Sequence, residues 1–157
     1  GTTAIQANDL VGRKTARDGG QTAKAIASQI EQTEKQLKAH SDARCHAVAK
    51  RLSAAREAFL DVVEFFVAES KSNPNAVYAG SVPYLMLAGN LMSGWQMGRA
   101  MLVALEHIAK NDDVAFMQAK VTTARFYADH ILCKAPGLRD SIIAGADSVT
   151  EMALEAF

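Results

Sequence analysis

The sequence is poor in several residue patterns, and each scarcity argues against a class of protein. Only three prolines and two cysteines occur in 157 residues. Cys45 and Cys133 lie far apart in a sequence without a secretory pattern, and we expect free thiols in a cytoplasmic protein. Polar and apolar residues never alternate with a period of two for long enough to form a sheet. These absences, with abundant alanine, predict an all-α protein that needs no disulfide.

Neither charge sign is in excess, because 17 basic residues balance 17 acidic ones. The chain therefore offers no electrostatic reason to expect nucleic acid or an anionic membrane as a partner. Residues 72–98 carry no charge and are numerous enough to cross a bilayer. Two prolines and several Asn, Ser and Gln residues interrupt this stretch, which favours the central helix of a helical bundle over a membrane span.

Sequence signatures of catalysis and metal binding are also missing. No histidine stands three or four residues from a Glu or another His, the spacing that builds a metal site on a helix; the four are His40, His46, His107 and His130. There is no Gly-x-Ser-x-Gly elbow and no glycine-rich phosphate loop. We expect no metal site and no catalytic residue within these 157 residues.

Apolar residues recur at helical spacing in windows bounded by cap and stop signals. The predicted helices cover residues 3–17, 21–39, 42–70, 74–110 and 112–134, followed by a short turn over 138–144 and a last helix opening at 148–151. The predicted architecture is an up-down four-helix bundle with an additional N-terminal helix and short C-terminal helices.

Local signals fix several of these boundaries. Gly19-Gly20 should stop the first helix, and Asp42 should cap the third. Asn73 followed by Pro74 starts the fourth helix, which Pro83 should kink or restart. Pro136 should break the fifth helix.

The fourth predicted helix contains an unusual group of residues in "GNLMSGWQMG". Gly94 and Gly98 are four apart, so they form a flat face that another helix can approach closely. Trp95 and Tyr84 are aromatic candidates for lining a ligand cleft, although core packing is the simpler reading. Arg99 is the only charge between Ser72 and Leu105, and we expect it to pair with an acid (Asp61, Glu64 or Asp129).

The opening "GTTAIQANDLVGRK" resembles the segment that follows the catalytic base in flavin-dependent acyl-CoA dehydrogenases, where Glu is followed by Gly-Thr, two variable residues, Ile and Gln. The later blocks "GWQMGRAMLVALEH", "FMQAKVTTARFYADHILCKAPGL" and "GADSV" resemble the extra C-terminal helical domain of a subgroup that includes relatives of methylmercaptopropionyl-CoA dehydrogenase. Together these blocks span the whole chain.

The resemblance implies a parent enzyme that uses FAD, oxidises acyl-CoA to 2-enoyl-CoA, passes electrons to an electron-transfer flavoprotein and forms a homo-oligomer. It places the catalytic Glu just before Gly1, the Gly1 backbone near the thioester, and Thr2, Thr3 and Ala4 near the FAD. Ala4 stands where many members have Gln, so a side-chain contact there is not implied.

By the same resemblance, residues 1–18 are the last helix of the dehydrogenase core and residues 19–157 an accessory C-terminal domain. We expect the isolated chain to bind no FAD and to be inactive. Its surface for packing on the core or on a neighbouring subunit is assigned to Gly94, Trp95, Gly98 and Arg99. The alternative is a free-standing helical module that binds a protein or a small ligand. The codons upstream of Gly1 distinguish the two.

Overall fold

The computed structural model describes residues 1–156, without the side chains of Thr150 and Leu154. No strand occurs in this range, so the prediction of an all-α fold is confirmed. The elements are α1 (Thr3–Asp9), the π-helix η1 (Leu10–Ala16), α2 (Gln21–Ala39), α3 (Ala43–Glu69), α4 (Pro74–Ala79), α5 (Ser81–Ala109), α6 (Val114–His130), the 3₁₀ turn η2 (Leu132–Lys134), α7 (Ala135–Ile143), α8 (Ala146–Thr150) and the 3₁₀ turn η3 (Leu154–Ala156).

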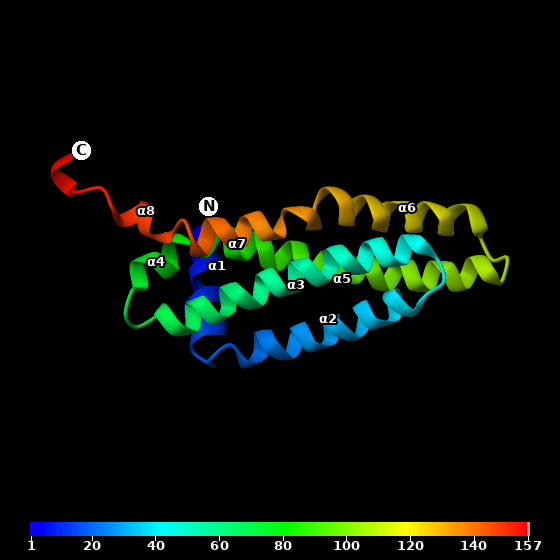
Figure 1. Cartoon of the computed structure of the whole chain (residues 1–157), viewed down its shortest axis with the longest axis horizontal. Coiled ribbons are helices and arrows are strands. Elements are labelled where there is room, and N and C mark those ends of the chain that lie inside the picture. Colours follow the sequence, from blue (N-terminus) through cyan, green and yellow to red (C-terminus); the bar gives the residue numbers. More distant parts are fainter. Residues whose placement is uncertain (157) are drawn as a thin grey trace.

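The long helices lie alongside one another, with α2 and α5 running in one direction and α3 and α6 in the other (Figure 1). Helix α3 packs against α2, α5, α6 and α7. The α1–η1 segment crosses the end of the molecule where α5 begins, and α8 projects from that same end (Figure 1). None of the helices described is long and apolar enough to span a membrane.

The core is centred on large apolar side chains of α3 and α5. Phe59 stacks on Tyr84 with ring centroids 5.7 Å apart, and Phe66 meets the same ring edge-on at 4.8 Å. Leu52 and Leu91 are completely buried. Each such side chain contributes about 1.5–3 kcal/mol by leaving water, so this contact zone accounts for much of the cohesion between the two helices.

Three predicted helix boundaries are confirmed, and each has a clear local cause. Gly19 and Gly20 have φ of 67° and 76°, the left-handed conformation that glycine adopts at little cost after a helix. The Asp42 carboxylate accepts a hydrogen bond from the Arg44 amide at 2.8 Å and caps α3. The Asn73 side chain accepts one from the Ala76 amide at the start of α4.

Other boundaries differ from the prediction because proline sits in first helical turns. The helix predicted over 74–110 is interrupted at Gly80, and Pro83 lies inside the first turn of α5, where its missing amide hydrogen is not needed. A Cβ at Gly80 would lie 2.7 Å from Ile142 Cγ2, so close packing of α7 favours glycine at this break. Pro136 likewise begins α7 rather than ending α6, and the break falls earlier, at Ile131.

The predicted helix opening at Ser148 is wrong. Helix α8 spans Ala146–Thr150, so Ser148 lies within it. The Ser148 hydroxyl donates to the Gly145 carbonyl at 2.8 Å instead of accepting from a downstream amide. A capping box needs that hydroxyl as an acceptor, which explains the failure of the signal here.

Candidate functional site

The N-terminal edge, Gly1 to Ala4, is fully open to solvent. All four residues are exposed, and α1 begins at Thr3 with Thr2 as its N-cap. The Thr2 hydroxyl makes no capping hydrogen bond. The first amides of a helix have no acceptor within it. Exposed hydroxyls beside such amides form a small polar surface able to receive a phosphate or ribose oxygen from outside the chain.

The π-helix η1 anchors this edge to the long helices. The Arg17 amide donates to the Gly12 carbonyl five residues earlier, at 3.1 Å, which is the π pattern. A Cβ at Gly12 would lie 2.6 Å from the Tyr78 hydroxyl, so glycine leaves room for α4. The Thr15 and Tyr84 hydroxyls lie 3.0 Å apart in a buried hydrogen bond. η1 is thus held against α4 and α5 by specific contacts.

A largely apolar cavity of about 220 Å³ lies behind η1. Its lining comes from η1, α2, α3 and α5: Leu10, Lys14, Thr15, Thr22, Ala23, Ile26, Phe59, Tyr84, Ala88 and Met92. Burial raises the pKa of Tyr84 to about 12, so the phenol stays neutral. The cavity is smaller than the 300–1,000 Å³ or so typical of ligand pockets. Tyr84 lines this cavity, and its buried ring is part of the core.

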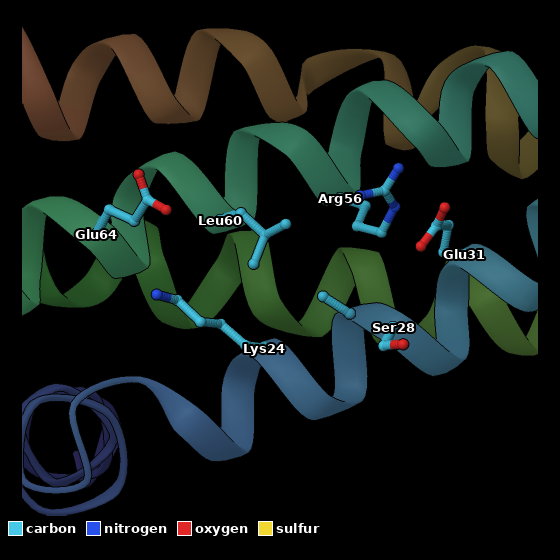
Figure 2. A pocket seen from close by; sticks show the side chains of 7 residues that line it. Lys24, Ser28, Glu31, Arg56, Leu60 and Glu64 are labelled. Carbon is cyan, nitrogen blue, oxygen red and sulfur yellow. The ribbon is translucent and has the colours of Figure 1, made fainter.

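A charged hollow of about 310 Å³ lies between α2 and α3. Arg56 and Glu31 point toward one another across it, while Lys24 and Glu64 lie on the other side of Leu60 (Figure 2). Two basic and two acidic side chains line this hollow, so they compensate each other. Such a balanced lining favours structural pairing over capture of a charged ligand.

Beneath the hollow, Arg56 forms a bidentate ion pair with Glu34. Its Nε and one terminal nitrogen donate to the two Glu34 carboxylate oxygens at 2.7 and 3.1 Å. The Glu34 side chain is only 1% exposed and that of Arg56 16%. The pair of hydrogen bonds raises the pKa of Arg56. This pair was not predicted from the sequence, because Glu34 lies among residues that otherwise follow the solvated face of α2.

Gly94 and Gly98 lie inside the molecule and not on its surface. A Cβ at Gly94 would meet three atoms of the Leu132 side chain at 2.6–2.8 Å. A Cβ at Gly98 would lie 3.1 Å from Leu37 Cδ1. The flat face predicted from their spacing is therefore occupied by η2 and α2 of the same chain.

Trp95 and Arg99 have roles that the sequence did not indicate. The Trp95 indole donates to the Thr33 hydroxyl at 2.8 Å, which joins α5 to α2. The expected ion pair of Arg99 with an acid is wrong. Within residues 1–156, Arg99 donates to Gln96 at 3.0 Å and lies over the Trp95 ring at 5.6 Å from its centroid. The acids Asp61 and Asp129 pair instead with Arg139 and Arg125.

The histidines and cysteines occupy separate places. Within residues 1–156, no three His, Cys, Asp or Glu side chains gather closely enough to hold a metal ion. His46 contacts the His40 carbonyl at 2.7 Å, and His107 contacts the Asp112 carboxylate at 2.7 Å. Cys45 is buried and unpaired with any other cysteine, and burial raises the pKa of its thiol. An inert packing role for Cys45 follows.

Comparison with known proteins shows the family to which the chain belongs. The family described as "Acetyl-CoA dehydrogenase C-terminal like" matches residues 23–153, which is most of the sequence. The chain belongs to this family. The match begins in α2 and ends close to the C-terminus, so it covers all the long helices but not the α1–η1 segment.

Two curated relatives extend the match to the N-terminal edge. The 3-methylmercaptopropionyl-CoA dehydrogenase of Ruegeria pomeroyi is 44% identical over 154 residues, covering 98% of this chain and 26% of the relative. The broad-specificity linear acyl-CoA dehydrogenase FadE5 of Mycobacterium tuberculosis is 31% identical over 176 aligned positions, covering 100% of this chain and 27% of the relative. The chain thus spans about a quarter of the length of these relatives.

Proposed function

We propose that this chain is the C-terminal part of an FAD-dependent acyl-CoA dehydrogenase, a parent enzyme that oxidises acyl-CoA to 2-enoyl-CoA. The observation that carries the proposal is the 44% identity to 3-methylmercaptopropionyl-CoA dehydrogenase across 98% of the chain. That match includes the α1–η1 segment, which the family match leaves out. Electron-transfer flavoprotein is the proposed electron acceptor, and the cytoplasm the proposed location.

The N-terminal edge is the proposed contact with the active site. The open hydroxyls of Thr2 and Thr3 and the first amides of α1 fit the polar groups of a dinucleotide cofactor. Ala4 offers only its backbone there. Gly1 lets the backbone approach a thioester closely, because it has no side chain. The base carboxylate would precede Gly1 and remove the α-proton of the substrate, and bound FAD supplies the acceptor for the β-hydride.

The remaining residues form the proposed accessory domain. Residues 1–18 would belong to the dehydrogenase core and residues 19–157 to a domain that acts in packing and oligomer assembly. Support comes from the described side chains: the basic and acidic residues that line the charged hollow balance each other, and no three His, Cys, Asp or Glu side chains within residues 1–156 gather as a metal site would require. The isolated chain is accordingly proposed to be inactive.

Flavin content provides the test. The full-length protein, expressed from its gene, should carry a flavin absorbance band that bleaches when acyl-CoA is added. A panel of acyl-CoA thioesters of different chain lengths would then define the substrate. Residues 1–157 expressed alone should be colourless and leave acyl-CoA unchanged. A colourless full-length protein, or a yellow fragment, would contradict the proposal.

A further inference from the structure

The cavity behind η1 has room for a small molecule. Its volume of about 220 Å³ exceeds the roughly 150 Å³ of an engineered core cavity that takes up benzene. It is too small for a cofactor or for acyl-CoA. It lies where the α1–η1 segment crosses the end of the long helices (Figure 1). The exposed lining residues Lys14 and Thr22 mark its mouth. We call it the η1 cavity.

Most of the cavity wall is apolar. The apolar side chains come from η1, α2, α3 and α5: Leu10, Ala23, Ile26, Phe59, Ala88 and Met92. Water beside such a wall finds few hydrogen-bond partners, because a well-held buried water needs two to four. A molecule that replaces poorly ordered water with apolar surface gains affinity. The wall therefore favours an organic occupant over water.

Two buried hydroxyls place a hydrogen-bond donor in this wall. Thr15 is 2% exposed and Tyr84 1%, and both line the cavity. The two hydroxyls carry two hydrogens, and the bond of 3.0 Å between their oxygens uses only one of them. Neither hydroxyl has another hydrogen-bond partner within residues 1–156. One hydrogen is therefore left for an acceptor that enters the cavity.

Other helical threonines show how such a hydrogen is usually satisfied. The Thr122 and Thr123 hydroxyls donate to the carbonyls four residues earlier, at 3.0 and 2.9 Å. In the π-helix η1, the hydroxyl of Thr15 bonds to Tyr84 instead. The donor thus faces the cavity wall of α5 and not the backbone of its own helix.

The charges around the cavity favour a neutral ligand. Among the described residues that line it, only Lys14 is charged. The Lys14 ammonium nitrogen lies 3.6 Å from an Asp9 carboxylate oxygen, so it already has a counter-charge. Because burial raises the pKa of Tyr84 to about 12, the phenol is neutral at pH 7. An anionic ligand would lose its hydration without a free cation to receive it.

We propose that the η1 cavity binds a small, neutral, mostly apolar molecule that carries one hydrogen-bond acceptor, such as a short ketone or ester. The carbonyl oxygen accepts the hydrogen left over from the Thr15–Tyr84 pair, and the hydrocarbon part fills the space between η1, α2 and α5. Such a ligand joins η1 to the long helices. The site goes beyond the proposed function and does not depend on it.

Protection of a cysteine in the cavity wall tests binding in the full-length protein. Ala88→Cys places a thiol in the lining, and methyl methanethiosulfonate labels it at a rate followed by mass spectrometry of the peptide that contains residue 88. Cyclohexanone is the probe, and it should slow labelling about elevenfold at ten times its Kd. Ala119→Cys, at an exposed position on α6, is the matched control and should react at the same rate with and without cyclohexanone.

Filling the cavity should abolish this protection. Ala23→Leu, combined with Ala88→Cys, adds a larger side chain at a buried position of the wall. Cyclohexanone should then no longer slow labelling, with helix content unchanged by circular dichroism. Protection that persists in this variant would place the ketone elsewhere and overturn the proposal. A thiol at residue 88 that the reagent never reaches, or that cyclohexanone never protects, would overturn it equally.

The hydrogen bond is tested separately with methylenecyclohexane, which keeps the ring but replaces the carbonyl oxygen by CH₂. Thr15→Val/Tyr84→Phe should weaken protection by cyclohexanone about fivefold, the value of one neutral hydrogen bond, and leave protection by methylenecyclohexane unchanged. Both hydroxyls must be removed, because either one alone has a hydrogen to donate. An equal change for the two probes would contradict the role of the hydroxyl pair.

The binding test with Ala23→Leu does not require the double variant to fold. The labelling readout also needs no flavin, so a failure of the dehydrogenase proposal is seen separately in the absorbance spectrum.

Discussion

At the scale of single residues, Glu34 and Arg56 form an ion pair whose carboxylate is almost completely buried. A carboxylate that is 1% exposed has lost almost all of its hydration, and the bidentate guanidinium replaces it. The two partners come from α2 and α3, so the pair also fixes how these helices face each other. The folded protein should therefore tolerate keeping both charges or removing both better than removing only one.

Removing one partner of this pair should be more damaging than removing both. Glu34→Gln removes the bidentate counter-charge of the guanidinium and should cost about 3 kcal/mol of unfolding free energy. The double variant Glu34→Leu/Arg56→Met, which restores an apolar contact, should recover most of that loss. Urea unfolding of the wild type, Glu34→Gln and the double variant measures the difference. A single variant as stable as the wild type would show that the pair is not a structural contact.

Asp42 links one carboxylate to acid stability. Hydrogen bonds from Arg44 are the main reason that its pKa falls from 3.8 to about 2. The folded pKa is lower than the unfolded value, so this stabilisation is complete above about pH 4 and is lost as the pH falls toward 2. Asp42→Ala should cost about 1 kcal/mol at pH 7, the usual value of an N-cap.

The matched control is Asp42→Asn, which keeps a capping oxygen but cannot titrate. At pH 7 it should be more stable than Asp42→Ala, because the cap remains, and less stable than the wild type, because the carboxylate's charge is gone; it should also lose the part of the pH dependence between 4 and 2 that Asp42 supplies. Chemical unfolding at several pH values separates the two effects. Equal losses in the Ala and Asn variants at pH 7 would contradict a capping role.

At the scale of elements, α5 has glycines with opposite surroundings. Gly94→Ala should destabilise the protein by about 1–3 kcal/mol, because the added carbon overlaps the Leu132 side chain. Gly89→Ala should leave the fold intact and add up to about 1 kcal/mol of helix stability, because its Cβ meets nothing. Thermal unfolding of the two variants measures this contrast. Equal effects would contradict the packing described for η2.

Helix positions were largely predictable from the sequence, and the reasons for success and failure are local. The prediction for residues 21–39 matches α2, because its apolar stripe and flanking glycines agree. The region 74–144 was predicted less well. The restart expected at Pro83 is found, with the break itself at Gly80 and Pro83 in the first turn of α5. Pro136 was expected to end a helix, but it lies in the first turn of α7, where proline costs little, and the break falls earlier, at Ile131.

The candidate surface was less predictable, because it depends on which neighbour covers each face. The spacing of Gly94 and Gly98 correctly indicates close packing but does not reveal that Leu132 and Leu37 of the same chain fill the space. The exposure of Gly89 and Ser93 is visible only after α6 and α7 have been placed. Which faces of α5 are covered therefore could not be assigned from sequence periodicity alone.

At the scale of the whole molecule, the α1–η1 segment packs against the long helices. This holds even though residues 1–18 are proposed to belong to the dehydrogenase core. Ala7, Val11 and Thr15 are buried against the long helices. Removing residues 1–18 would open the cavity beside Phe59 and Tyr84 to water. The shortened chain should have a lower Tm than residues 1–157 and bind a hydrophobic dye. An unchanged Tm would show that residues 19–157 are equally stable without the α1–η1 segment, as expected for an independent domain that begins after residue 18.

The π-helix η1 makes the orientation of Gly1 to Ala4 depend on the form of the helical turns that follow them, as well as on the sequence. An α-helix turns by about 100° per residue. The buried residues of the N-terminal segment are spaced by four: Ala7 in α1, and Val11 and Thr15 in η1. The wider i to i+5 turns of η1 keep residues at this spacing on one face. If η1 relaxed to an ordinary α-helix with its length unchanged, everything before it would rotate by about 100°, because π turns hold more residues than α turns. Gly1 to Ala4 would then point away from whatever lies beyond them, although every one of their side chains would be unchanged.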